Sequence, residues 1–123
     1  MKNNVYYCYL IISKKRTYIG ITNNLGKRIK RHKKIIKGGA KSTRCQKDWY
    51  YHTIIGKFNN RGQASRFEYY WKHIRNKKNK WIRNKSTINE KMKRLVQLLL
   101  KEEWKDKSLI INTFINKKID FIT

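Results

Sequence analysis

The sequence has 123 residues, and its 32 lysines and arginines against 7 acidic residues give a formal net charge of +25. A net charge of about 2 to 8 is enough to keep a small domain soluble, so the excess predicts an anionic partner. Hydrophobic residues make up 39% of the chain, which supports one folded core and excludes a wholly disordered basic tail. The chain has neither a long apolar run nor a signal-peptide pattern, so we expect a single intracellular domain, in the nucleus or cytoplasm or at a viral replication site.

Acidic residues are nearly absent from the first two thirds of the chain. Residues 1–47 contain 14 lysines and arginines and no carboxylate, and up to residue 89 the only carboxylates are Asp48 and Glu68. Two-metal nucleases need several carboxylates to hold their ions. If this chain cuts nucleic acid, it therefore uses at most one well-held metal ion. The isolated Cys8 and Cys45 form no zinc-binding pattern.

Four segments have the composition of strands. Residues 5–13 (VYYCYLIIS) and 17–22 (TYIGIT) are rich in β-branched and aromatic residues and are separated by three basic residues, which predicts an antiparallel hairpin. Residues 49–58 (WYYHTIIGKF) predict a third strand, and residues 109–114 a possible final one.

Three further segments have helical periodicity. The first runs from about 24 to 36, the second over 63–77, and the third from 87 to about 104. Thr87 and Glu90 form a capping-box pattern at the start of the third helix. Together with the strands, this order predicts an α+β fold with a three-stranded antiparallel sheet flanked by helices.

We expect no domain boundary within the chain, because no linker or change of composition divides it. Residues 1–85 would form the core, and residues 86–123 would add a helix and a short strand packed on the same domain. Residues 37–47 (KGGAKSTRCQK) predict a basic, glycine-containing loop.

Five residues could form a catalytic site. Tyr9 and Tyr18 lie on successive strands of the predicted hairpin, Arg28 and His32 share one face of the first helix, and Glu68 lies at the edge of the apolar face of the second. Each has an ordinary structural interpretation when taken alone, such as an i, i+4 pair of Glu68 with a lysine. Their joint occurrence favours a site. We interpret the other two histidines, His52 and His73, as structural.

These residues resemble a known family. Tyr7-Cys8-Tyr9 followed by Tyr18-Ile19-Gly20 resembles the two motifs that name the GIY-YIG nucleases, and Arg28, His32 and Glu68 follow in the family's order. The sequence departs from the pattern at Tyr7, which replaces the first glycine, and in the slightly shorter distance between the two motifs. The segments 39–44 and 67–73 are similar to the catalytic subunit of Slx-type endonucleases, which cut branched DNA, and to its small bacterial and viral relatives.

The resemblance implies a metal-dependent, structure-selective DNA endonuclease that acts on junctions or flaps in repair, recombination or replication. Glu68 would hold a single Mg²⁺ or Mn²⁺, and Arg28 would bind the phosphate. Tyr9 or Tyr18 would deprotonate the attacking water, with nearby cations lowering the pKa of the phenol, while His32 would contact a tyrosine or transfer protons. The sequence does not decide between the two tyrosines.

The expected partner is branched DNA, with no role for a membrane. The predicted DNA-binding residues are Lys27, Lys30, Arg31, Lys34, Lys41 and Arg44. No counterpart of the RING-type zinc domain of the Slx-type subunit is found, so a protein scaffold partner is not carried over. Two alternatives remain open, namely a non-catalytic nucleic-acid-binding module with the same fold and a sequence-specific homing or restriction-type nuclease.

Overall fold

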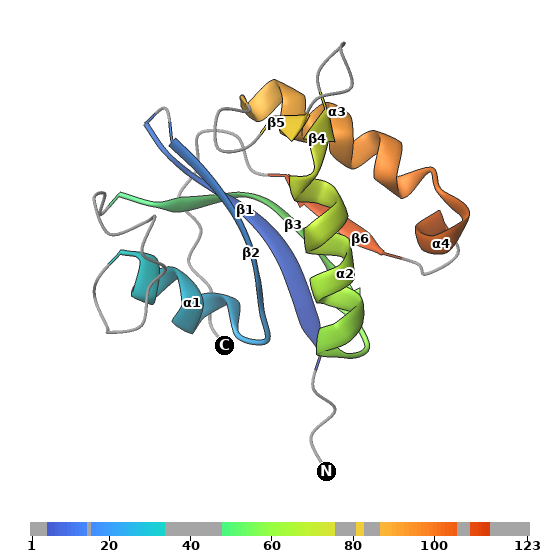
Figure 1. The fold of residues 1–123 in the computed structure, drawn as a ribbon. Helices are drawn as coiled ribbons and strands as arrows, with labels where there is room; N and C mark the ends of the chain where they lie inside the picture. The colour runs from blue at the N-terminus through green and yellow to red at the C-terminus, as the bar shows by residue number, and fades with distance from the viewer. Residues whose placement is uncertain are drawn as a thin grey trace.

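The computed structural model describes residues 5–14, 16–33, 48–75, 81–82, 87–105 and 109–113. Its main sheet is antiparallel and has four strands in the order β2-β1-β3-β6 (Figure 1). These strands are β1 (Tyr6–Ser13), β2 (Arg16–Thr22), β3 (Tyr50–Phe58) and β6 (Ile110–Thr113). The predicted α+β class is confirmed. The final strand, predicted as a possible one, pairs with β3 and widens the three-stranded sheet.

Side chains of the central strand β1 alternate between two hydrophobic cores. Cys8 and Leu10 point to one face of the sheet and Tyr9 and Ile11 to the other, and all four are fully buried. Such alternation follows from the two-residue period of a strand. A sheet that is buried on both faces needs helices on both.

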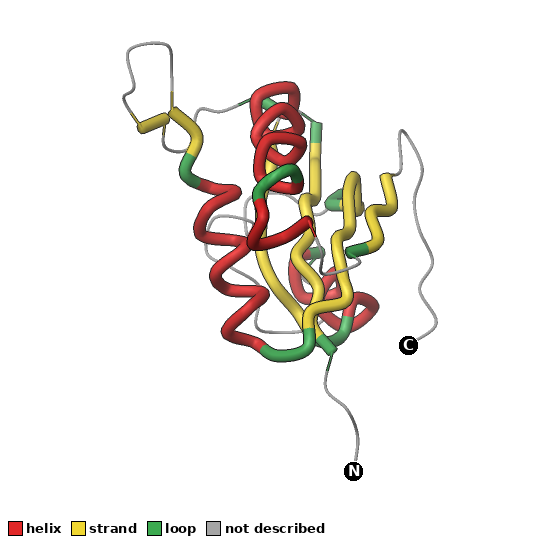
Figure 2. Tube along the Cα trace, turned by 90° about the vertical axis from the view of Figure 1, so that its right-hand side faces the viewer, coloured by secondary structure: helices red, strands yellow, loops and turns green. Residues whose placement is uncertain are grey.

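Helix α1 (Leu25–His32) covers the face that carries Tyr9, whereas α2 (Arg61–Lys72), α3 (Ile88–Leu99) and α4 (Glu102–Lys105) form the core on the opposite face. In Figure 1, strands β1 and β2 run between α1 and α2. The side view in Figure 2 shows the longer helices, in red, alongside the yellow strands. Among the described residues, no helix combines the length and the apolar character needed to cross a bilayer.

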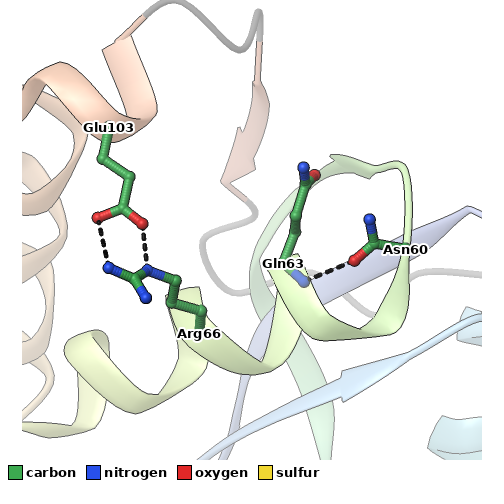
Figure 3. Close-up of polar contacts among 4 residues, drawn as sticks. All are labelled: Asn60, Gln63, Arg66 and Glu103. Atoms are coloured by element: carbon green, nitrogen blue, oxygen red, sulfur yellow. Dashed lines mark hydrogen bonds and ion pairs between the residues drawn. The ribbon is translucent and has the colours of Figure 1, made fainter.

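Asparagine side chains start the first two helices. Asn24 accepts a hydrogen bond from the Lys27 amide (3.0 Å), and Asn60 accepts one from the Gln63 amide (2.8 Å), as Figure 3 shows for the second. These bonds satisfy amides that have no partner within the helix. The caps therefore fix where the helices that carry the candidate residues begin.

Two helix ends differ from the prediction. α1 ends at His32, and residues 34–36 of the predicted helix lie outside the described part. α2 begins at Arg61 and ends at Lys72, because the backbone of Ile74 and Arg75 pairs as β4 with β5 (Trp81–Ile82). This two-stranded sheet was not predicted, and the helix predicted over 63–77 was too long.

The third predicted helix is divided into α3 and α4. The Thr87–Glu90 capping box is present, but the chain turns after Leu99, and the Lys101 amide donates to the Leu98 carbonyl (3.1 Å). This turn lets Trp104 pack edge-on against two rings, those of Phe58 and Phe67. On the surface, Arg66 of α2 forms an ion pair with Glu103 of α4 (Figure 3).

Candidate active site

Tyr9, Arg28 and His32 form a hydrogen-bonded cluster between β1 and α1. Arg28 Nε donates to Tyr9 Oη (3.0 Å), and Tyr9 Oη also lies 2.8 Å from His32 Nε2. Four-residue spacing places Arg28 and His32 on one side of α1, and Tyr9 and His32 are fully buried. Of the two roles that the resemblance implied for His32, contact with a tyrosine or proton transfer, the structure contains the contact, and its partner is Tyr9.

Gly20 leaves the space that the Tyr9 ring occupies. It is paired with Tyr9 across the hairpin, and a Cβ atom at this position would lie 2.4 Å from Tyr9 Oη and 2.7 Å from Cζ. Both distances are shorter than any normal contact, and Tyr9 cannot move away without losing its bonds to Arg28 and His32. Only glycine fits here.

We therefore expect Gly20→Ala to destabilise the protein by about 1 to 3 kcal/mol, the usual cost of overpacking, and to slow any catalysis that depends on Tyr9. Denaturant unfolding and a cleavage assay measure the two effects. Gly62→Ala is the matched control, since its Cβ would meet only the Asn60 side chain at 3.3 Å in an exposed helix turn. Equal stability of the two variants would contradict the argument.

Tyr18 lies beside this cluster but is not directly opposite Tyr9. It pairs with Ile11, so the two tyrosines are diagonal neighbours, with ring centroids 6.4 Å apart. The Tyr18 ring is also 5.1 Å from that of His32. Tyr18 is partly exposed whereas Tyr9 is fully buried, so the two phenols have different access to solvent.

Glu68 approaches from the opposite face of the sheet. Lys72 Nζ lies 3.7 Å from Glu68 Oε2 and 5.5 Å from the centroid of the Tyr18 ring. This is possible because β2 is the terminal strand of the sheet, so side chains of α2 reach around it to the side that faces α1. Tyr18, Arg28 and Glu68 thus meet at the outer edge of β2, which we call the β2 edge, and Arg28 links them to the buried pair Tyr9 and His32.

Burial dominates the electrostatics of the site. It raises the pKa of the Tyr9 phenol against the opposing effect of Arg28, although the sequence led us to expect that nearby cations would lower it. Arg28 does lower the pKa of Tyr9, as expected of a nearby cation, but burial has the larger effect because the ring is removed from water. Burial likewise raises the pKa of Glu68, although Lys72, Arg28 and Arg61 act in the opposite direction.

Burial, with a smaller contribution from the charge of Arg28, lowers the pKa of His32 to about 4 from its ordinary value of 6.5. His32 is therefore neutral at neutral pH. As pH falls from 6.5 to 4, the unfolded chain takes up a proton at this position before the folded protein does. Stability contributed by neutral His32 is thus complete above pH 6.5 and is lost as pH falls towards 4.

We expect this loss to be about 2 to 3 kcal/mol of unfolding free energy. Unfolding measured across that pH range in the protein and in His32→Gln gives the difference, since the variant lacks the titrating group. Identical pH dependence in the two proteins would contradict the buried, neutral state of His32.

Tyr51 supports the site and was not predicted. Its hydroxyl donates to the Leu25 carbonyl (2.6 Å) at the start of α1, and its ring packs edge-on against Tyr9 with centroids 5.5 Å apart. Tyr51 thereby fixes both α1 and the Tyr9 ring. Nothing in the sequence distinguishes it from the adjacent Tyr50, because only the alternation of β3 decides which of the two faces α1.

The predicted DNA-binding residues are only partly described. Lys27 and Lys30 are exposed on α1 and Arg31 is partly exposed, whereas Lys34, Lys41 and Arg44 lie outside the described residues. Their roles stay predictions.

The chemistry of Glu68 fits a single hard cation. Within the described ranges, no three His, Cys, Asp or Glu side chains gather as a metal-binding group. One carboxylate is enough for Mg²⁺, which usually keeps several waters and shares substrate phosphates. Glu68 is partly buried, and its carboxylate pairs with the ammonium of Lys72. The carboxylate therefore already stabilises a positive charge at this position.

Comparison with known proteins identifies the family. The profile described as GIY-YIG catalytic domain matches residues 5–81. The chain therefore belongs to the GIY-YIG family, which is a class of nucleases and hence of phosphodiester hydrolases.

Individual relatives are consistent with this family. The chain is 32% identical over 140 aligned residues to the "Structure-specific endonuclease subunit SLX1 homolog" of Cryptosporidium parvum, which covers 93% of the chain and 34% of that protein. It is 32% identical over 124 residues to "Structure-specific endonuclease subunit slx1" of Schizosaccharomyces pombe. This alignment covers 93% of the chain and 45% of that protein. An uncharacterized protein of Acanthamoeba polyphaga mimivirus is 39% identical over 87 residues. This alignment covers 68% of the chain and 51% of that protein. The chain spans about a third of the length of the first relative and less than half of the second.

Proposed function

We propose that this protein is a structure-selective DNA endonuclease that hydrolyses phosphodiester bonds in junctions, flaps and other branched DNA during repair, recombination or replication. The observation that carries the proposal is the convergence of Arg28, two phenols and one carboxylate at the β2 edge. The names of the relatives support the choice of substrate.

Arg28 binds the scissile phosphate in this proposal. Its guanidinium is oriented through Nε by Tyr9, and a guanidinium has donors arranged to bind two phosphate oxygens at once. Burial alone lowers the pKa of Arg28, but the adjacent phenols Tyr9 and Tyr18 outweigh it and raise the pKa. Arg28 therefore stays charged and can stabilise negative charge that develops on the phosphate.

Tyr18 acts on the attacking water. It is the phenol that reaches solvent, whereas Tyr9 Oη is buried between Arg28 and His32. Tyr18 Oη would orient the water and accept its proton while the new P–O bond forms and the bond from phosphorus to the departing oxygen breaks. Tyr9 then has a positioning role, because it holds Arg28.

The family depends in general on a divalent metal ion, and here we propose Mg²⁺ or Mn²⁺ with Glu68 as its protein ligand. When bound, such an ion supplies positive charge to the phosphate and to the departing oxygen. Glu68 holds the position for that charge, and Lys72 keeps the carboxylate oriented towards the β2 edge.

The test is incubation of the protein with a labelled four-way junction, a flap and a linear duplex of shared sequence, each with Mg²⁺, Mn²⁺ or a chelator. We expect metal-dependent cuts at positions fixed relative to the branch, which move when the branch is moved. A linear duplex should be cut much more slowly, because continuous DNA costs more energy to deform. Cutting at one sequence of linear DNA would contradict the proposal, and binding without cutting any substrate would favour the non-catalytic alternative.

The two phenols should differ in their effect on the rate. We expect Tyr18→Phe to reduce single-turnover cleavage about a hundredfold or more, as loss of a general base does. Tyr9→Phe removes one hydrogen bond to a charged group and should cost about tenfold. Kinetics with saturating protein measure both. A larger loss in Tyr9→Phe would assign the water to the buried phenol instead.

A further inference from the structure

We propose that the Tyr69 ring, held against His73 on the outer side of α2, is a platform on which an unpaired base of the DNA stacks next to the scissile phosphate. This inference rests on the proposed function and specifies its substrate as DNA with unpaired nucleotides at the branch.

Tyr69 is an exposed aromatic residue immediately after Glu68. More than half of its surface (55%) is accessible, whereas its helix neighbours Phe67 and Trp71 are fully buried. Adjacent helix positions are rotated by about 100°, so Tyr69 lies on the outside of α2 while Glu68 faces the β2 edge. Their Cα atoms are about 3.8 Å apart, so the ring and the candidate metal ligand occupy adjacent positions of one helix turn.

The ring of Tyr69 is held in place. Its centroid lies 3.9 Å from that of His73 with the planes 33° apart, and Tyr70 packs edge-on against it at 5.3 Å. His73 Nδ1 donates to the carbonyl of Tyr69 (2.7 Å), which fixes the imidazole relative to the helix. A pre-ordered ring loses little conformational entropy when a base binds to it.

Basic residues outnumber acidic ones around the ring. Helix α2 carries three cations, Arg61, Arg66 and Lys72, of which Arg66 forms an ion pair with Glu103 and Lys72 with Glu68. The ammonium of Lys101 adds a further charge 5.9 Å from the Tyr70 ring. Exposed aromatic rings within a cationic surface are the combination by which proteins bind single-stranded nucleic acid.

The platform requires a base that is not already stacked and paired. In a continuous duplex every base is covered by its neighbours, whereas nucleotides at a branch or flap can leave the stack. A strand with its phosphate at Glu68 can place such a base on Tyr69. The platform would thus contribute directly to selectivity for branched DNA, without reading the sequence.

The test measures equilibrium binding of the full chain in chelator, so that no cleavage occurs. The probes are a splayed-arm DNA with 2-aminopurine at the first unpaired position and a blunt duplex of equal length. We expect Tyr69→Ala to weaken binding of the splayed DNA about 5- to 150-fold, the range for loss of one stacked base, and to abolish the quenching of 2-aminopurine. Affinity for blunt duplex should change less than about twofold.

Two further variants identify the group responsible. Tyr69→Phe retains the ring and should bind and quench like the unmodified protein. Leu100→Ala removes an even more exposed apolar side chain, at the C-cap of α3, with 71% of its surface accessible, and should change nothing. The platform is wrong if Tyr69→Ala weakens binding of both DNAs equally or of neither. It is also wrong if Tyr69→Phe weakens binding of the splayed DNA as much as Tyr69→Ala does.

The result is separable from the nuclease assay. A protein that cuts no DNA but shows the selective effect of Tyr69 would overturn the proposed function and leave the platform intact. A protein that cuts branched DNA while Tyr69→Ala binds normally would overturn the platform alone.

Discussion

Glu68→Gln should reduce cleavage of branched DNA at least about a thousandfold while leaving the fold and DNA binding nearly unchanged. The substitution keeps the size and hydrogen-bonding capacity of the side chain but removes the negative charge that a hard cation requires. Up to residue 89, Asp48 is the only other carboxylate, and in the structure it accepts a hydrogen bond from Ser13. Among the described residues, no group of three or more His, Cys, Asp or Glu side chains could hold the ion in place of Glu68.

Single-turnover cleavage of a junction over a range of Mg²⁺ concentrations measures this effect, with affinity and circular dichroism measured in parallel. Glu102→Gln is the matched control, because it makes the same charge change on the exposed surface of α4 and should cut normally. Mg²⁺-dependent cutting that is undiminished in Glu68→Gln would remove Glu68 from the site.

Arg28→Ala should lower the cleavage rate about a hundredfold to a thousandfold, the usual cost of removing one preorganised donor to a developing negative charge. It removes the charge opposite the phosphate and also leaves buried Tyr9 Oη without the Nε donor. Arg28→Lys restores the positive charge but not the planar guanidinium that binds two phosphate oxygens, so we expect only partial recovery of the cleavage rate.

The same single-turnover assay applies, with thermal unfolding to confirm that each variant is folded. Lys105→Ala removes an exposed positive charge from α4 and controls for the overall reduction in charge. If that control loses as much activity as Arg28→Ala, the effect arises from general electrostatic attraction rather than from a contact in the site.

Local sequence signals predicted the elements that carry the site. The two β-branched and aromatic runs around Tyr9 and Tyr18, with three basic residues between them, predicted the hairpin, and helical periodicity predicted the helix that follows. These features depend on residues close together in the sequence. The prediction failed where contacts between residues further apart in the sequence determine the local structure. Examples are Ile74, which pairs with Ile82, and the turn that buries Trp104.

The arrangement of the site depended even more on tertiary structure. The sequence indicated that the five residues belong together, but not that Glu68 approaches from the face opposite Tyr9. That geometry follows from the strand order, which places β2 at the end of the sheet. The positioning role of Tyr51 and the space at Gly20 likewise require the packed structure.

The terminal position of β2 has a consequence for assembly. In the described part of the chain, the outer backbone groups of this strand face no neighbouring strand, and such an edge is a template to which an extended segment of another chain can add. A segment paired there would run past Tyr18 and Lys72 and cover the approach to Glu68. We therefore expect strand addition at this edge to compete with the proposed binding of DNA, and bound DNA to protect the sheet from edge-to-edge aggregation.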